Sequence, residues 1–417
     1  MSRPDQPTTA FVWVWLPGEA DPVVAGRLDA SGDRVDFTYG RSYLARSDAI
    51  ALYRPELPLR PGTQRPVDGL HIAGCINDAG PDAWGQRIIL HRRTGAAGPV
   101  ADTTELGALT YLLESGSDRI GALDFQADPE RYVARTSGGT LEEMVEAADR
   151  LEAGEPLSTD LDEALLHGTS VGGARPKVLL TDGDRRLIAK LSSSRDPYPV
   201  VKAEGVAMEL ARRVGLDVAA TEVTTCLDHD VLLVERFDRP GGDRRRLLVS
   251  ALTILRLDEL FARYATYHEL ADQVRAGFTE PDATLRELFA RITFNICVSN
   301  TDDHARNHAA FWDGELLTLT PAYDLCPQLR AGNVTAQAMA YGPGDARASR
   351  LADLVDHAGI YHLTAAQARE IVDHQLDVIR SSWDDAADRA RLTSAERAAL
   401  WGRQVLNPFA LEGYEAG

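Results

Sequence analysis

The chain has 417 residues, which exceeds what a single hydrophobic core usually holds and predicts two or three domains. Hydrophobic residues make up 44% of the chain and charged residues 26%, a composition typical of folded globular proteins and not of disordered ones. The formal net charge of −19 opposes direct, non-specific binding to DNA or to an anionic membrane.

Residues 1–135 are predicted to form an N-terminal α/β subdomain. Apolar alternation predicts strands at 11–16, 34–39 and 120–125, and a helix is expected at 81–92. The first apolar run is too short for a signal peptide or a membrane span. The four cysteines lie far apart without zinc-ligand spacing, so free thiols and a cytoplasmic location are expected.

Residues 136–250 are predicted to form a β-rich lobe, entered through a charged amphipathic helix at 141–152. A glycine-rich stretch at 167–176 leads into a strand that begins at Lys177. Glycine lets backbone N–H groups approach phosphate oxygens, so the stretch is a candidate phosphate loop. Taken alone, the stretch is better explained as an ordinary glycine-rich hairpin.

The next strand of this lobe is predicted at 186–191 and contains Lys190 among apolar residues. A lysine inside an apolar strand is costly unless it has an anionic partner. Two partners suit it, a nucleotide phosphate and Glu204 on the helix predicted at 201–214. The order of glycine loop, lysine strand and glutamate helix favours this interpretation over a surface lysine on an edge strand.

Two more strands are expected after that helix, at 219–226 and 231–237, and the second runs into a Pro-Gly-Gly break. Such a break suits a hinge between two lobes. There, backbone groups of Glu235 and Phe237 are candidates for contacts with an adenine edge, and Asp238 is a candidate for a ribose contact.

Residues 251–417 are predicted to be mainly helical, with a buried apolar helix at 285–299 that delivers the segment after it. In that segment, Asp302 is followed five residues later by Asn307. Two short apolar runs around Asp313-Gly314 then predict a hairpin with a two-residue type I′ turn, which leads to Asp324.

An Asp, an Asn five residues on, a hairpin and a second Asp form the catalytic core of protein-kinase-like phosphotransferases. In such a core the first Asp orients or deprotonates the attacking hydroxyl, and the other two residues hold Mg²⁺ against nucleotide phosphates. The spacing alone is weak, because a polar loop with Asx turns produces it too. Asp303 also lies in this loop, but only Asp302 has the five-residue spacing to Asn307.

Together these motifs resemble those of the HipA family, bacterial serine/threonine kinases that are the toxin halves of toxin–antitoxin pairs. The resemblance is carried, in family order, by Gly-Thr-Ser-Val-Gly-Gly-Ala-Arg-Pro-Lys, Ile-Ala-Lys-Leu, Val-Glu-Arg-Phe-Asp-Arg, Asn-Thr-Asp-Asp-His-Ala-Arg-Asn-His and Thr-Pro-Ala-Tyr-Asp-Leu. Residues 74–89, GCINDAGPDAWGQRII, resemble part of the family's N-terminal subdomain. The expected fold class is α+β: a two-lobed protein-kinase-like fold with an N-terminal α/β subdomain, a β-rich lobe and an all-helical C-terminal lobe.

The resemblance implies a role for each matching residue. Asp302 matches the catalytic base, and Asn307 and Asp324 match the Mg²⁺ ligands. Ser170 matches the loop serine that such kinases autophosphorylate. Glu204, the anionic partner expected for Lys190, supports this site. The residues that the resemblance implies in ATP binding are Gly172, Gly173, Ala174, Arg175, Lys177, Lys190, Glu235, Phe237, His304, Asn307, Tyr323 and Asp324. Asp238, the ribose candidate, completes the expected ATP site.

The leading hypothesis is therefore an ATP- and Mg²⁺-dependent serine/threonine protein kinase that acts as a toxin on a cytoplasmic protein. The resemblance implies a translation factor or an aminoacyl-tRNA synthetase as the class of substrate. It also implies a HipB-like helix-turn-helix antitoxin dimer as partner, with DNA contacted mainly through that partner, and no membrane. The alternatives are a small-molecule or lipid kinase of the same fold, and a non-catalytic nucleotide-binding co-repressor.

Overall fold

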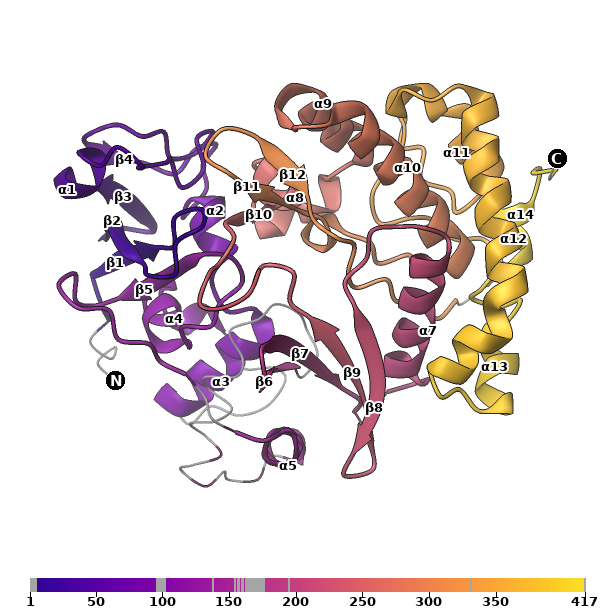
Figure 1. The fold of residues 1–417 in the computed structure, drawn as a ribbon, viewed down its shortest axis with the longest axis horizontal. Coiled ribbons are helices and arrows are strands. Elements are labelled where there is room, and N and C mark those ends of the chain that lie inside the picture. The colour runs from indigo at the N-terminus through magenta and orange to yellow at the C-terminus, as the bar shows by residue number, and fades with distance from the viewer. Residues whose placement is uncertain are drawn as a thin grey trace.

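Three β-sheets organise the residues that the computed structural model describes (Figure 1). A continuous hydrophobic core runs from the N-terminal sheet through the helix of the β-rich lobe into the C-terminal helices. The described residues are 6–94, 103–136, 139–153, 155, 158, 161, 177–193, 196–330 and 332–415.

The N-terminal region is built on a five-stranded antiparallel sheet with the order β4-β3-β2-β1-β5. Alternate residues of the first strand, such as Val12 and Val14, are fully buried. Gly26 lies where a Cβ atom would come 2.3 Å from the Thr38 carbonyl oxygen, so this close approach requires glycine. The elements are β1 (Thr9–Val14), β2 (Val23–Ser31), β3 (Arg34–Tyr39), α1 (Arg41–Leu44), β4 (Thr63–Gln64), α2 (Gly74–Asn77), α3 (Ala83–Thr94), η1 (Thr103–Glu105), α4 (Ala108–Glu114), β5 (Leu123–Gln126) and α5 (Leu141–Ala153).

The β-rich lobe contains a four-stranded antiparallel sheet with the order β6-β7-β9-β8, and one helix packs on β8 and β9. A Cβ atom on Gly205 of that helix would lie 2.3 Å from the Val223 side chain. Glycine therefore sets how closely the helix, and with it Glu204, approaches the sheet. The elements are β6 (Lys177–Asp182), β7 (Arg185–Leu191), α7 (Val200–Arg213), β8 (Thr221–Cys226) and β9 (His229–Glu235).

The C-terminal lobe is not all-helical as expected, because it also carries a small antiparallel sheet with the order β10-β11-β12, although helices dominate it. No helix in the described part of the chain combines the length and apolarity needed to cross a membrane. The elements are β10 (Leu248–Ser250), α8 (Ala251–Ile254), η2 (Glu259–Tyr264), α9 (Tyr267–Gly277), α10 (Pro281–Val298), η3 (Ala305–Asn307), β11 (Ala309–Trp312), β12 (Leu317–Leu319), α11 (Leu351–Asp356), η4 (Ala358–Tyr361), α12 (Ala365–Arg389), α13 (Ser394–Leu400) and α14 (Pro408–Leu411).

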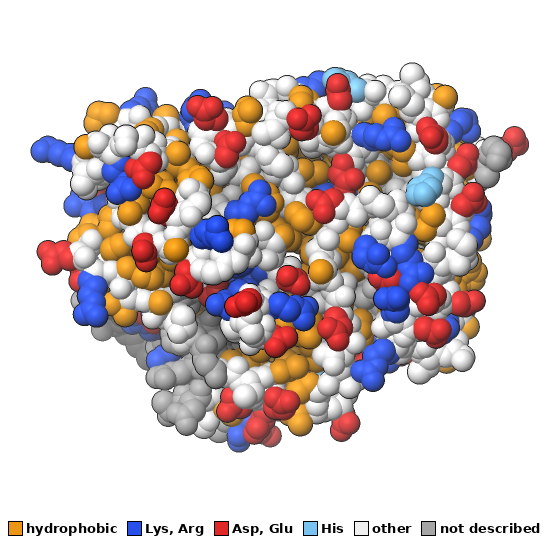
Figure 2. Space-filling model, viewed as in Figure 1, with side chains coloured by type: hydrophobic (Ala, Val, Ile, Leu, Met, Phe, Trp, Pro, Cys, Tyr) orange, Lys and Arg blue, Asp and Glu red, His pale blue; other side chains and the backbone are white. Residues whose placement is uncertain are grey.

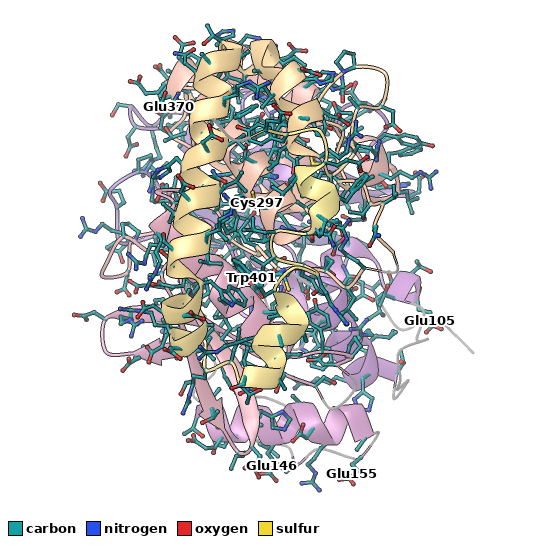
Figure 3. The ribbon with its side chains drawn as sticks, turned by 90° about the vertical axis from the view of Figure 1, so that its right-hand side faces the viewer. Glu105, Glu146, Glu155, Cys297, Glu370 and Trp401 are labelled. Carbon is teal, nitrogen blue, oxygen red and sulfur yellow. The ribbon has the colours of Figure 1, made fainter. Side chains whose placement is uncertain are left out.

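Helix α10 leads into the segment before β11, and helix α12 packs against α10. The apolar helix α10 is largely buried and ends at Val298, and the left-handed backbone of the next residue, Ser299 (φ 54°), turns the chain into residues 300–308. The Ser299 hydroxyl donates to the Gln404 carbonyl at 2.6 Å. Helix α12 runs along one side of the molecule, with Cys297 of α10 behind it (Figure 3). Because α12 contacts both α7 and α10, it ties the β-rich lobe to the helical lobe.

The hairpin after this segment is present, but its turn differs from the expected one. Trp312 pairs with Leu317, and the Asp313 N–H donates to the Leu316 carbonyl at 3.4 Å, so the chain reverses at Gly314 and Glu315 and not at Asp313-Gly314. A type I′ turn needs positive φ at both central residues, and of the pair Asp313-Gly314 only the glycine has it (φ 106°). The Asp313 side chain instead accepts the N–H groups of residues 315 and 316, each at 2.8 Å. This side-chain cap takes the place of the expected type I′ turn at Asp313-Gly314.

A buried charge cluster joins the N-terminal region to the chain that follows β9. Arg236 and Arg239 each donate to both Asp118 and Asp238 at 2.8 Å. Asp238 also accepts the N–H of Gly121 at 2.7 Å. Burial opposes ionisation of Asp238, but the two guanidinium groups hold its pKa below the usual range. Charges this deep are stable only when paired, so the cluster fixes the two regions against each other.

We predict that Asp238→Asn lowers the free energy of unfolding by about 3 to 5 kcal/mol, because it leaves buried guanidinium charge uncompensated. Urea denaturation of the full chain measures this, with Asp184→Asn, at an exposed turn, as the control. Since the pKa of Asp238 is depressed in the folded state, the difference should shrink as the pH falls below about 4. Equal stabilities of Asp238→Asn and wild type at pH 7 would contradict the prediction.

Candidate active site

Two buried lysines face each other in the β-rich lobe. Lys177 of β6 and Lys190 of β7 are direct partners across the antiparallel pair, and each is 8% exposed. Like charges in this arrangement repel, so the pair requires nearby anions. Lys190 Nζ donates to Glu204 of α7 and to Asp324 of the C-terminal lobe. The expected ion pair of Lys190 with Glu204 is therefore confirmed, and a second partner joins it from the other lobe.

These charged groups shift one another's ionisation. Burial disfavours the charged form of Lys190, but Asp324 and Glu204 outweigh it and raise its pKa. Burial likewise opposes ionisation of Asp324, yet Lys190 and Lys177 hold its pKa well below the usual range. Burial raises the pKa of Glu204, and the neighbouring Asp324 charge adds to this. The Lys190–Asp324 pair is thus the charged centre of the site.

Asp324 and Asn307 are the two residues expected to offer side-chain oxygens to Mg²⁺. Asp324 has a φ of 60°, a costly conformation for a non-glycine residue and one that gathers at functional sites. Asn307 donates its amide Nδ2 to the Asp302 carbonyl at 3.3 Å, which leaves its Oδ1 as the ligand atom. No three His, Cys, Asp or Glu side chains of the described residues form a metal cluster. Two oxygen ligands fit Mg²⁺, which fills its shell with phosphate oxygens and water.

Asp303 is the buried anchor of the loop at 300–308. Its side chain is 1% exposed and accepts hydrogen bonds from the Tyr267 hydroxyl and from the Asn295 amide, the latter at 2.6 Å. The His308 ring lies 2.9 Å from the same carboxylate. Since these three partners are themselves buried, Asp303 holds the loop in place and does not reach a substrate.

Asp302, one residue earlier, is exposed. Its carbonyl accepts the N–H of His304 at 2.9 Å, and the His304 carbonyl in turn accepts the N–H of Asn307 at 2.8 Å. Partial desolvation and the nearby Asp324 raise the pKa of Asp302, against the effect of His304. A raised pKa suits a carboxylate that takes a proton from a hydroxyl. The environment therefore favours Asp302 over Asp303 as the candidate base.

Phe237 and Tyr323 form an aromatic wall beside the charged centre, with ring centroids 5.7 Å apart. The Tyr323 hydroxyl donates to the Arg306 carbonyl at 2.8 Å, so the ring is the part of Tyr323 that can line a ligand site. Glu235 donates its N–H to the carbonyl of Ala220 at 2.8 Å. An adenine contact from the backbone of Glu235 therefore depends on its carbonyl oxygen.

The expected contact between Asp238 and a ribose is wrong. Asp238 is 2% exposed, and its carboxylate is occupied by Arg236, Arg239 and the Gly121 amide. It belongs to the cluster that joins two regions of the fold. The remaining expectations for the phosphate loop and its serine lie outside the described residues, and they concern Ser170, Gly172, Gly173, Ala174 and Arg175.

Asp82 is a site neighbour that sequence reasoning missed. It directly precedes α3, and its Oδ1 accepts the Gly85 N–H at 2.9 Å, while its Oδ2 is buried without a hydrogen bond. Burial raises the pKa of Asp82 to about 7, against the effects of the Gly85 N–H and of the Lys177 charge. The N-terminal region thus places a carboxyl group near the lysine pair. The only sequence signal was its place in the segment 74–89.

Comparison with known proteins identifies the family. Residues 169–383 match the model described as the HipA-like C-terminal domain. HipA of Shewanella oneidensis, named as a serine/threonine-protein kinase toxin, is 28% identical over 184 residues, which are 37% of this chain and 42% of that protein. Toxin YjjJ of Escherichia coli is 24% identical over 194 residues, 43% of this chain and 42% of its own. Y4mE of Sinorhizobium fredii, with a provisional kinase name, is 28% identical over 231 residues, 45% and 54% of the two chains.

These alignments span about half or less of the curated relatives. The fold is similar over much more of the chain. Shewanella oneidensis HipA, in its complex with HipB and operator DNA, superposes with a TM-score of 0.68 at 19% identity, covering 94% of this chain and 96% of that one. The two-lobed α+β, kinase-like fold expected from the sequence is therefore confirmed. Because the family model matches more than half of this chain, the chain belongs to the HipA family.

Proposed function

We propose that this chain is an ATP- and Mg²⁺-dependent serine/threonine protein kinase and the toxin half of a toxin–antitoxin pair. The observation that carries the proposal is the charged Lys190–Asp324 pair between the two lobes, with the exposed Asp302 near it. A buried lysine and carboxylate that meet across lobes, beside an accessible carboxylate of raised pKa, suit phosphoryl transfer better than a purely structural role.

Each residue has a defined task in this proposal. Asp302 orients the attacking hydroxyl and accepts its proton, and Lys177 and Lys190 hold phosphate oxygens. Asn307 and Asp324 hold Mg²⁺, which neutralises charge on the phosphates when it is bound. Glu204 keeps Lys190 in position, and the rings of Phe237 and Tyr323 pack against the adenine. His304 shapes the loop that carries Asp302 through its two backbone hydrogen bonds.

The partners belong to the same proposal. The structural relative from Shewanella oneidensis is in complex with HipB and operator DNA, which supports a HipB-like helix-turn-helix antitoxin dimer as partner of this chain. The net charge of −19 favours DNA contact mainly through that partner. In agreement, basic side chains are interspersed with acidic ones on the face seen in Figure 2. A cytoplasmic translation factor or aminoacyl-tRNA synthetase is the proposed class of substrate.

Two other functions compete with this one, and an assay with γ-labelled ATP separates them. A protein kinase labels itself or an added protein, whereas a small-molecule or lipid kinase needs a different acceptor. A non-catalytic co-repressor binds nucleotide without transferring phosphate. The acidic charge of the chain argues against the lipid kinase, whose substrate surface is anionic.

We predict that Asp302→Asn abolishes phosphate transfer, because the substitution removes the proton acceptor and keeps the side-chain volume. The variant should melt like wild type, since Asp302 is exposed. Asp303→Asn is the matched variant: loss of a buried hydrogen-bonded carboxylate should lower thermal stability measurably. Near wild-type transfer by Asp302→Asn, together with a stable but inactive Asp303→Asn, would reverse the two assignments.

We also predict that Ser170 becomes phosphorylated and that this modification switches the enzyme off. A phosphoserine carries roughly −1.5 to −2 charge at neutral pH. In a loop that holds ATP phosphates, this charge repels the nucleotide. Mass spectrometry after incubation with Mg²⁺–ATP should find phosphate on Ser170, and the modified protein should bind ATP poorly. An active kinase with unmodified Ser170, or full ATP affinity after modification, would contradict the prediction.

A further inference from the structure

Asp78, directly after α2, connects the N-terminal region to the C-terminal lobe. Helix α2 lies against β10 and α8 of that lobe (Figure 1). The Asp78 side chain is 7% exposed, and its two oxygens accept the N–H and the hydroxyl of Ser250, each at 2.7 Å. A buried carboxylate with two such short hydrogen bonds holds its partner tightly.

Ser250 pairs with the residue that directly follows the loop at 300–308. It is the last residue of β10, and its Cα partner in β11 is Ala309, the first residue after that loop. The next N–H along, that of Ala251, donates to the His308 carbonyl at 2.8 Å. Asp78 therefore holds the strand that anchors the C-terminal end of the loop.

Arg306 gives Asp78 a second connection to the same loop. Its Nη1 lies 4.0 Å from Asp78 Oδ1, and its guanidinium also pairs with Glu259. The Arg306 carbonyl accepts the Tyr323 hydroxyl at 2.8 Å. Arg306 directly precedes Asn307, and Tyr323 directly precedes Asp324. Both proposed Mg²⁺ ligands are thus next to residues that this chain of contacts holds.

We propose that Asp78 is a positioning residue of the phosphotransfer site, contributed by the N-terminal region and acting through Ser250 and Arg306. The family-model match begins at residue 169, so this residue lies outside it. Burial raises the pKa of Asp78, but Arg306 and the two hydrogen bonds from Ser250 oppose the rise, as suits a carboxylate placed to pair with a guanidinium. The inference rests on the proposed function for its kinetic test only, because the order of the loop can be measured without activity.

The test compares full-length wild type with Asp78→Asn and with the control Asp36→Asn. Asp36 is also a buried carboxylate of the N-terminal region and pairs with Arg34 at 2.9 Å, within β3. In Asp78→Asn, amide hydrogen exchange should become faster in peptides that cover residues 300–309, and it should stay unchanged there in the control. With labelled Mg²⁺–ATP and dephosphorylated casein as acceptor, kcat should fall on the order of 10- to 100-fold in Asp78→Asn and should stay at the wild-type value in the control.

Wild-type exchange at 300–309 in Asp78→Asn would overturn the inference, and so would an equal acceleration in both variants. A loss of kcat without faster exchange would also overturn it. If wild type itself transfers no phosphate, the proposed function fails, and the exchange experiment still decides the role of Asp78. If Asp78→Asn does not fold, Ser250→Ala keeps the backbone N–H that donates to Asp78 and removes the hydroxyl, which also caps α8 by accepting the Thr253 N–H at 3.3 Å. This variant should show the same exchange change at 300–309 to a smaller degree.

Discussion

A lysine buried inside an apolar strand is the constraint on which the rest of this structure depends. Lys190 cannot be left without an anion, since an uncompensated charge at such a depth costs several kcal/mol. Lys190 pairs with Glu204 on α7, and Gly205 sets how closely that helix approaches the sheet. It also pairs with Asp324, which follows the β11–β12 hairpin in the chain. One ammonium group thereby brings together three segments from two lobes, and α12 packs against both lobes to hold them there.

Burial separates the aspartate that we propose as the catalytic base from the aspartates that hold the fold. Asp302 is exposed, whereas its neighbour Asp303 is almost fully buried by Tyr267, Asn295 and His308. Asp238, close to the aromatic wall in sequence, is likewise buried in an arginine cluster. All three residues are aspartates, so it is the surroundings of each carboxylate that distinguish their roles.

Sequence patterns predict the helices and strands that depend on nearby residues. They do not predict the role of a side chain whose partners lie far away in the chain. The lysine strand, its glutamate helix and the buried helix α10 follow from periodicity, and all three are present. Strand β2 was missed because Gly26, Arg27 and Asp29 interrupt its apolar alternation. Asp78 gave no local signal because its partner Ser250 lies 172 positions away. The ribose role expected for Asp238 failed for a similar reason, since Asp118 and Gly121 come from another region of the chain.

The most direct test of the Lys190-centred site is calorimetric titration of ATP with Mg²⁺ into wild type and into Lys190→Met. Methionine keeps the apolar stem and removes the charge, and thermal melting checks that the variant is folded. If Lys190 holds nucleotide phosphates, wild type should bind ATP saturably and with a dependence on Mg²⁺. The affinity of the variant should then be weaker on the order of 10- to 100-fold. Equal affinity in a folded Lys190→Met variant, or no ATP binding by wild type, would contradict the assignment.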